Sequence, residues 1–207
     1  VQEPGSIEVD ITGLDRDSFL FLLRSLYIRG YDDVKLIFNN PLADHHRLGK
    51  KVKVISEIHN EINRLTGMEV LQQRENFCIL KVLTSASIKD FDVIMRRIFL
   101  LITDASNDLI KGAEKGDKYL VESIEEKHNS ITKFMANALR LLNTVGYPNY
   151  KNTCLYYHII KSLDTINDIL KESARDVIKS NIKISKICES ILNRINELFY
   201  IIRNICK

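Results

Sequence analysis

Proline and glycine are scarce in this chain, which has 3 Pro and 8 Gly among its 207 residues. Five of the glycines and two of the prolines lie in the first 90 residues, and the remaining 117 residues hold three glycines and one proline. Because these residues mark turns and interrupt helices, their distribution predicts a turn-rich first part and a helical second part.

Other absences narrow the class of protein. The four cysteines stand far apart and form no CxxC pair, which indicates neither a disulfide framework nor a zinc ribbon and favours a reduced, cytoplasmic compartment. No apolar run approaches the length of a membrane span, so we expect no membrane insertion.

The 30 basic residues against 27 acidic ones give a net charge of +3. This balance is too even for a protein that binds nucleic acid mainly through its phosphates. The chain begins with Val1, so we expect a preceding N-terminal segment to be missing.

Residues 1–84 are predicted to form a small α/β sandwich with its helices on one face of the sheet. Apolar and polar residues alternate in four stretches typical of strands, and two stretches between them have helical spacing. The polar stretch 39–49 is predicted to be a loop. In chain order these elements are strand 7–11, helix 15–29, strand 34–38, helix 50–65, strand 68–73 and strand 77–83.

Residues 85–207 are predicted to form an antiparallel helical bundle, so that the fold class is α+β and mainly α. Four long helices have apolar residues three and four positions apart. The sequence leaves open whether the last two helices are separate or joined near residue 180. The helices cover roughly 87–114, 117–145, 152–179 and 182–205. The inward face predicted for the last helix consists of Ile184, Ile187, Ile191, Ile195, Leu198, Ile202 and Ile205.

Two oxygen-bearing pairs on neighbouring helices are candidate metal ligands. Asp164 and Asp168 lie four residues apart, and so do Glu125 and Asn129, so each pair shares a helix face. If the two pairs face each other, they can hold a divalent cation. If they do not, they form a solvated acidic surface, which is the more frequent arrangement on helices.

Histidines provide two further candidates. His128 lies on an apolar face, where a hydrogen-bonded core histidine is the more frequent arrangement. Zinc binding with Cys154 and His158 is the alternative. The sequence Asp44-His45-His46-Arg47 is interpreted as a polar loop, and binding of a metal or an anion is its alternative. No Gly-rich phosphate loop, GxSxG or HExxH motif occurs, so we expect no enzymatic activity.

The segment from Phe91 to Glu172 resembles the PhoU domain of phosphate-uptake regulators. The sequence Leu163-Asp164-Thr165-Ile166-Asn167-Asp168 stands where that family has a Leu-Glu-Arg-Ile-Gly-Asp-like run, and Glu125-Glu126-Lys127-His128-Asn129 stands where it has Asp-x-x-Val-Asp/Asn. The first half looks like the archaeal form of these regulators, in which an AbrB-like DNA-binding domain often precedes the chain. Its matching stretches are Ile11-Thr12-Gly13, Tyr27-Ile28-Arg29-Gly30-Tyr31-Asp32, Gly67-Met68-Glu69-Val70 and Arg96-Arg97-Ile98-Phe99.

The resemblance implies a cytoplasmic regulator of phosphate uptake and phosphate homeostasis. It implies contacts with phosphate transport or sensing proteins, a homodimer, and an iron, zinc or other divalent metal at Glu125, Asn129, Asp164 and Asp168. Transcriptional regulation, and with it DNA binding, is expected only through the missing N-terminal domain. Two alternatives remain open: a structural or oligomerisation bundle, and a metal-dependent hydrolase of phosphate compounds built on Glu125, Asp164 and Asp168.

Overall fold

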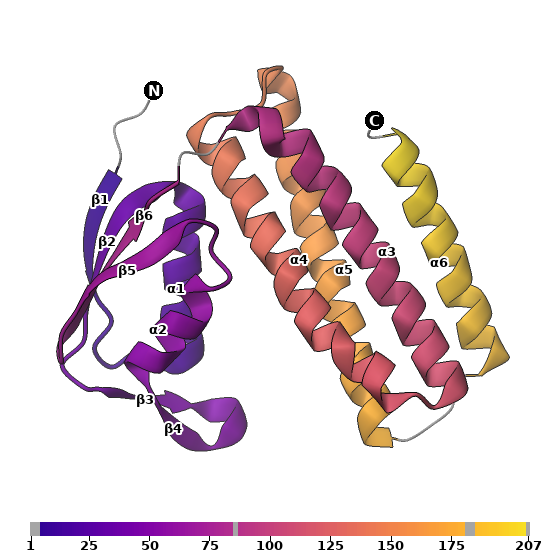
Figure 1. Cartoon of the computed structure of the whole chain (residues 1–207), viewed down its shortest axis with the longest axis horizontal. Helices are drawn as coiled ribbons and strands as arrows, with labels where there is room; N and C mark the ends of the chain where they lie inside the picture. The colour runs from indigo at the N-terminus through magenta and orange to yellow at the C-terminus, as the bar shows by residue number, and fades with distance from the viewer. Residues whose placement is uncertain (1–4, 85–86, 181–184, 206–207) are drawn as a thin grey trace. The chain divides into compact units, whose positions relative to one another are not determined.

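A computed structural model describes residues 5–84, 87–180 and 185–205 of the chain. Its contacts divide the chain into two compact units, which Figure 1 colours along the sequence. The first unit comprises Val1–Ile88 and Ala136–Thr153, and the second comprises Lys89–Met135 and Cys154–Lys207. The long helix in the middle of the chain therefore contributes its last turns to the α/β unit and its first turns to the helical unit.

A mixed four-stranded sheet with two helices on one face forms the first unit (Figure 1). The strand order is β1-β2-β6-β5; β1 and β2 are parallel, and the other neighbours are antiparallel. The predicted strands and helices are confirmed, with ends shifted by a few residues. They are β1 Gly5–Asp10, α1 Arg16–Arg29, β2 Tyr31–Ile37, α2 Val54–Ile62, β5 Met68–Gln73 and β6 Phe77–Val82.

The predicted polar loop at 39–49 is partly wrong. Leu42–His45 forms strand β3 and pairs antiparallel with strand β4, Lys50–Lys53, after a single turn of 3-10 helix. Consequently α2 begins at Val54, four residues later than the predicted start at Lys50. Strands as short and polar as these carry too little apolar alternation to be recognised in the sequence.

Helix α1 begins and ends as its sequence predicts. The Asp15 carboxylate accepts a hydrogen bond from the amide of Ser18, which caps the first turn. Gly30 closes the helix at φ 108°, a left-handed conformation that glycine adopts without a steric penalty. The face between these caps packs into the core of the unit, whose largest buried members include Phe19, Leu23, Tyr27, Leu36, Ile58 and Leu80.

One buried cation closes the C-terminal end of α1. Arg140, in the last turns of helix α4 (Lys118–Thr144), is 4% exposed. Its Nη1 donates to the carbonyl oxygens of Tyr27 at 2.5 Å and Tyr31 at 3.0 Å, and its Nη2 donates to Gly30 O at 3.4 Å. Nη2 also pairs with the Asp32 carboxylate. The guanidinium therefore adds a charged donor to carbonyl groups at the C-terminal end of α1 and the start of β2.

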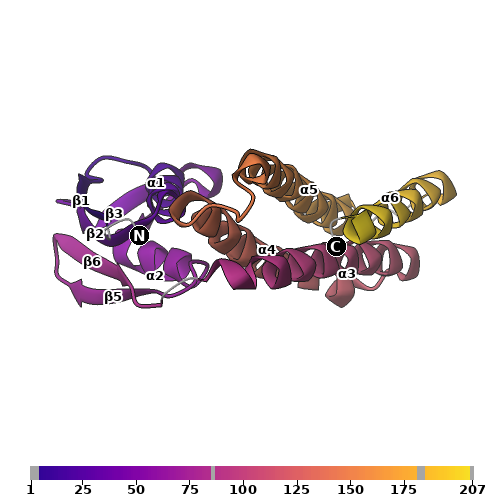
Figure 2. The same cartoon turned by 90° about the horizontal axis from the view of Figure 1, so that it is seen from above.

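Long helices make up the second unit, as predicted (Figure 2). They are α3 Phe91–Lys115, the first part of α4, α5 Thr153–Ser180 and α6 Lys186–Ile205. None of the helices in the described part of the chain combines the length and the apolar composition needed to cross a membrane. Buried residues of α3 form much of the apolar interior of this unit, among them Phe91, Ile98, Phe99, Ile102, Ala105 and Leu109.

The prediction for the apolar face of α6 is wrong. We expected it to point inward, but Ile187 is 74% exposed and the rest of its described members are 38% to 58% exposed. Helix α6 instead packs on α3 through another face, on which Phe199 is buried and Asn196 Nδ2 donates to Asn107 Oδ1 at 2.8 Å. Periodicity identifies an apolar face and does not identify what covers it. The exposed members are Ile187, Ile191, Ile195, Leu198 and Ile202. Ile184, the side chain of Ile205 and the junction at 181–184 lie outside the described residues.

Candidate functional site

A histidine, a carboxylate and a lysine meet between α4 and α5. His128 is on the buried side of α4 and is 8% exposed. Its Nε2 lies 3.0 Å from Asp168 Oδ1 and 3.3 Å from Lys171 Nζ. Lys171 Nζ also donates to Asp168 Oδ1 at 2.6 Å. One helix thus supplies the imidazole, and the next supplies an acid and a base that both contact the same ring nitrogen.

A buried amide beneath this cluster fixes the two helices in register. Asn167 is 1% exposed, and its Nδ2 donates to the carbonyl oxygen of His128 at 3.3 Å and to Thr132 Oγ1 at 3.4 Å. On the other side of the ring, His128 Nδ1 lies 3.4 Å from Asn129 Oδ1. The imidazole therefore has polar neighbours at both ring nitrogens, and its backbone is bound to α5.

Burial and charge determine the ionisation of the cluster. Burial lowers the pKa of His128, and the neighbouring Lys171 charge lowers it further, against the opposing effect of Asp168. Burial works against ionisation of Asp168, but hydrogen bonds from Lys171 and His128 outweigh it and lower the pKa of this carboxyl. At neutral pH the cluster is therefore a neutral imidazole beside an ammonium–carboxylate pair. The Nε2 either donates to Asp168 or accepts from Lys171, depending on the tautomer.

The low pKa of His128 predicts a loss of stability in mild acid. The unfolded chain protonates histidine near 6.5, above the pKa in the folded state. The contribution of neutral His128 to the free energy of unfolding is therefore complete above pH 6.5. It is lost as the pH falls through the pKa that His128 has in the folded state. Urea unfolding should show that the free energy of unfolding declines between about pH 7.5 and 5.5, and that this decline is smaller in His128→Gln. The exposed His158→Gln is the control and should keep the wild-type slope, and equal slopes in wild type and His128→Gln would contradict the assignment.

The structure places two of the four predicted metal ligands beside His128 and pairs the other two with basic side chains. Asn129 and Asp168 both contact His128. Glu125 lies one turn earlier in α4, where both of its oxygens accept from Arg175, at 2.9 and 3.2 Å. Asp164 pairs with Lys161 of its own helix at 2.7 Å. Each of the three carboxylates consequently has a basic side chain as its partner.

This donor set does not fit a metal ion as it is arranged. In the described part of the chain, no three His, Cys, Asp or Glu side chains are grouped so that they could hold a metal. Lys171 and Arg175 place positive charge beside Asp168 and Glu125, which repels a second cation. We derive no chemical step through a metal, and the metal assignment stays a prediction that elemental analysis of the purified protein decides.

The other histidine candidates lie elsewhere. Cys154 and His158 are both exposed on α5. His45 is buried at the end of β3, with no partner in the described structure for its Nδ1. His46 is exposed, and its Nε2 lies 3.9 Å from Asp15 Oδ2. The expectation that His128 is a core histidine bonded to a neighbour is confirmed.

Sequence reasoning missed the basic partners of the site. Lys171 and Arg175 follow Asp168 and Glu172 by three positions, a spacing that favours ion pairs along one helix. This signal was present in the sequence. Nothing local indicated that Arg175 also reaches Glu125, which lies 50 residues earlier.

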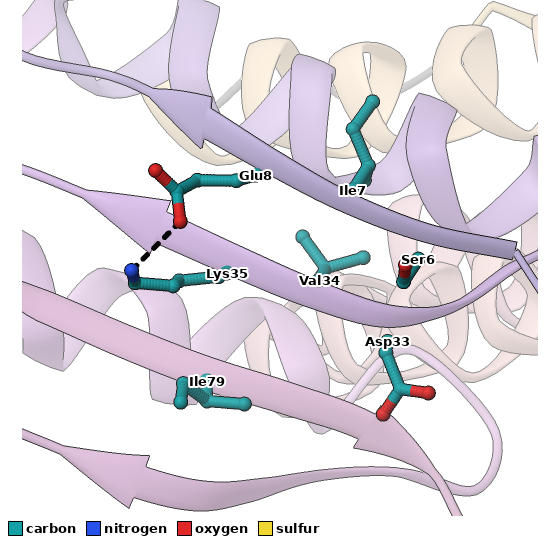
Figure 3. A pocket seen from close by; sticks show the side chains of 7 residues that line it. All are labelled: Ser6, Ile7, Glu8, Asp33, Val34, Lys35 and Ile79. Carbon is teal, nitrogen blue, oxygen red and sulfur yellow. Dashed lines mark hydrogen bonds and ion pairs between the residues drawn. The ribbon is translucent and has the colours of Figure 1, made fainter.

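A shallow hollow on the sheet of the first unit is the other candidate site (Figure 3). Side chains of β1, β2 and β6 line it, and each of its charged groups has an oppositely charged partner. Lys35 Nζ donates to Glu8 Oε2 at 2.7 Å, and Asp33 pairs with Lys81 at 3.1 Å. These pairs neutralise the charges of the hollow, so we favour the His128 cluster as the candidate functional site.

No protein-family model, curated protein or solved structure matches this chain.

Proposed function

We propose that the chain is a cytoplasmic, non-enzymatic regulator of phosphate uptake and phosphate homeostasis that acts through contacts with phosphate transport or sensing proteins. One observation supports the proposal most. The two segments that resemble PhoU domains, residues 125–129 and 163–168, meet in the helical unit through the contact between His128 and Asp168 and the bond from Asn167 to the carbonyl of His128. Two separate segments that resemble one family are stronger support for that family's function when they form a single site.

The mechanism we propose is recognition through helix faces. The cluster of His128, Asp168 and Lys171 links α4 to α5, and the charges of its members depend on one another. A ligand or partner that changes this ionisation also changes how firmly the two helices are held. The exposed helix faces then present an altered surface to a partner protein.

Deletion of the coding sequence in the source organism tests the proposal. We expect the rate of radiolabelled phosphate uptake, and its repression by external phosphate, to change and to be restored by the wild-type chain. A His128→Gln/Asp168→Asn double variant should restore it poorly, whereas Asp164→Asn, which alters a carboxylate that pairs with Lys161 of its own helix in the described structure, should restore it fully. Unchanged phosphate uptake after deletion would contradict the proposed function and favour the structural alternative.

A further inference from the structure

Helix α6 packs on α3 through one narrow face. Among the described side chains of α6, four are buried or half-buried, and they follow one another at the three- and four-residue spacing that places them on one side of a helix. They are Glu189, Leu192, Asn196 and Phe199. Figure 1 shows α6 beside α3 and running in the opposite direction. Because Glu189 belongs to this face, a carboxyl group is part of the contact with α3.

A second carboxyl group lies opposite Glu189. Asn196 Nδ2 donates to Asn107 Oδ1 at 2.8 Å, which fixes the register of the two antiparallel helices. Two turns away from this bond on each helix, α3 has Glu114 and α6 has Glu189. The carboxyl groups of Glu114 and Glu189 lie within hydrogen-bonding reach of each other. Ionised carboxylates only accept hydrogen bonds, so a bond between these two requires one proton.

The helix ends indicate which of the two acids holds this proton. Glu114 lies in the last turn of α3, where the helix dipole disfavours a negative charge. Glu189 lies in the first turn of α6, where the dipole favours one. The proton therefore resides on Glu114, and the carboxylate of Glu189 accepts the bond.

The surrounding groups act on Glu114 in the same direction. Partial loss of hydration raises the pKa of Glu114, and the hydrogen bond and the negative charge of Glu189 raise it further, whereas Lys115 lowers it. The charged residues within four positions of either acid are all exposed. They are Lys111, Lys115, Asp117, Lys118 and Lys186.

We propose that Glu114 and Glu189 form a pH-dependent latch, which holds the start of α6 against α3 while the two carboxyl groups share one proton. When both groups are ionised, their like charges repel and the hydrogen bond is lost. Because the pKa of Glu114 is raised in the folded chain, the contribution of the latch is complete in acid and is lost as the pH rises through that pKa.

The rest of the contact makes α6 sensitive to the latch. Asn196 Oδ1 is buried and has no partner in the described part of the chain, and a buried polar atom without a partner weakens the contact that contains it. Loss of the bond between Glu114 and Glu189 therefore loosens a helix that is held by few groups. The inference concerns the docking of α6 and does not depend on the role in phosphate uptake.

Amide hydrogen exchange of the full chain, followed by NMR, tests the latch. The measured quantity is the protection of the α6 amides relative to an unstructured chain at the same pH. We expect this protection to fall severalfold in the wild type between about pH 4.5 and 7.5. Glu114→Gln should keep it high at both pH values, because a carboxamide donates to Glu189 without needing a proton. The matched control Glu122→Gln alters an exposed glutamate of α4 and should keep the wild-type pH dependence.

The titration of Glu114, followed by the chemical shift of its carboxyl carbon, gives a second measurement. We expect its midpoint to fall in Glu189→Gln, which removes the neighbouring negative charge. The His128 cluster changes stability with pH in the opposite direction, so each variant is compared with the wild type at the same pH. Protection in wild-type α6 that does not fall as the pH rises overturns the inference. An unchanged pH dependence in Glu114→Gln, or an unchanged Glu114 midpoint in Glu189→Gln, overturns it as well.

Discussion

Replacing Arg140 by Ala should lower the free energy of unfolding by about 1–3 kcal/mol, the cost of leaving buried polar groups without their hydrogen-bond donor. The variant leaves the Asp32 carboxylate without this partner and removes the donor to the carbonyls of Tyr27, Gly30 and Tyr31. It also removes the guanidinium that lies 4.8 Å from the centre of the Tyr27 ring. Buried polar groups that lose their partners keep the cost of their desolvation.

Chemical denaturation followed by far-UV circular dichroism and tyrosine fluorescence measures this loss. Arg96→Ala is the control, because Arg96 is an exposed arginine of α3 and its replacement should change the stability by less than about 0.5 kcal/mol. Arg140→Lys should recover only part of the loss, since an ammonium lacks the planar fork that reaches several acceptors. An Arg140→Ala protein as stable as the control would show that the contacts of Arg140 contribute nothing to stability.

The sequence predicted the elements of this fold better than their contacts. Asp15 and Gly30 bound α1 in the sequence as they do in the structure, because helix caps depend on residues only a few positions away. Arg140 bonds to groups more than 100 residues earlier in the chain. No local pattern distinguishes this buried arginine from an exposed one, so its role became visible only in the folded chain.

The candidate site was also predictable only in part, because local patterns indicate faces of helices and not the contacts between them. Periodicity placed His128 on a buried face and Asp168 one turn from Asp164 on the following helix. The contact between His128 and Asp168 joins residues 40 positions apart, and it depends on the register of α4 against α5. That register is stabilised by Asn167, whose burial no spacing rule indicated. The apolar face of α6 shows the same limit, since its residues were identified correctly but assigned to the wrong surroundings.

Gly112→Ala should destabilise the helical unit, although alanine is the better helix former. Gly112 is buried inside α3, and at an unhindered position the substitution would stabilise a helix by about 1 kcal/mol. Here an added Cβ would lie 2.6 Å from Val121 Cγ2, 3.2 Å from the carbonyl oxygen of Asp117 and 3.3 Å from the amide of Val121. Two of these contacts are with backbone atoms, which cannot rotate away, so α3 and the start of α4 must separate.

Overpacking of this kind costs about 1–3 kcal/mol, and we expect the net effect to be a loss of stability. Thermal unfolding followed at 222 nm, a wavelength that reports helix, should show a lower midpoint for Gly112→Ala. The double variant Gly112→Ala/Val121→Ala separates the causes, because it removes the side-chain clash and keeps both backbone contacts. If Gly112→Ala alone raises the midpoint, the close approach of α3 and α4 does not limit the residue at this position. Single effects that simply add in the double variant assign the limit to the two backbone contacts. A double variant that is more stable than the sum of the single effects would assign part of the loss to the Val121 side chain. The loss that remains would then come from the backbone contacts at the α3–α4 turn.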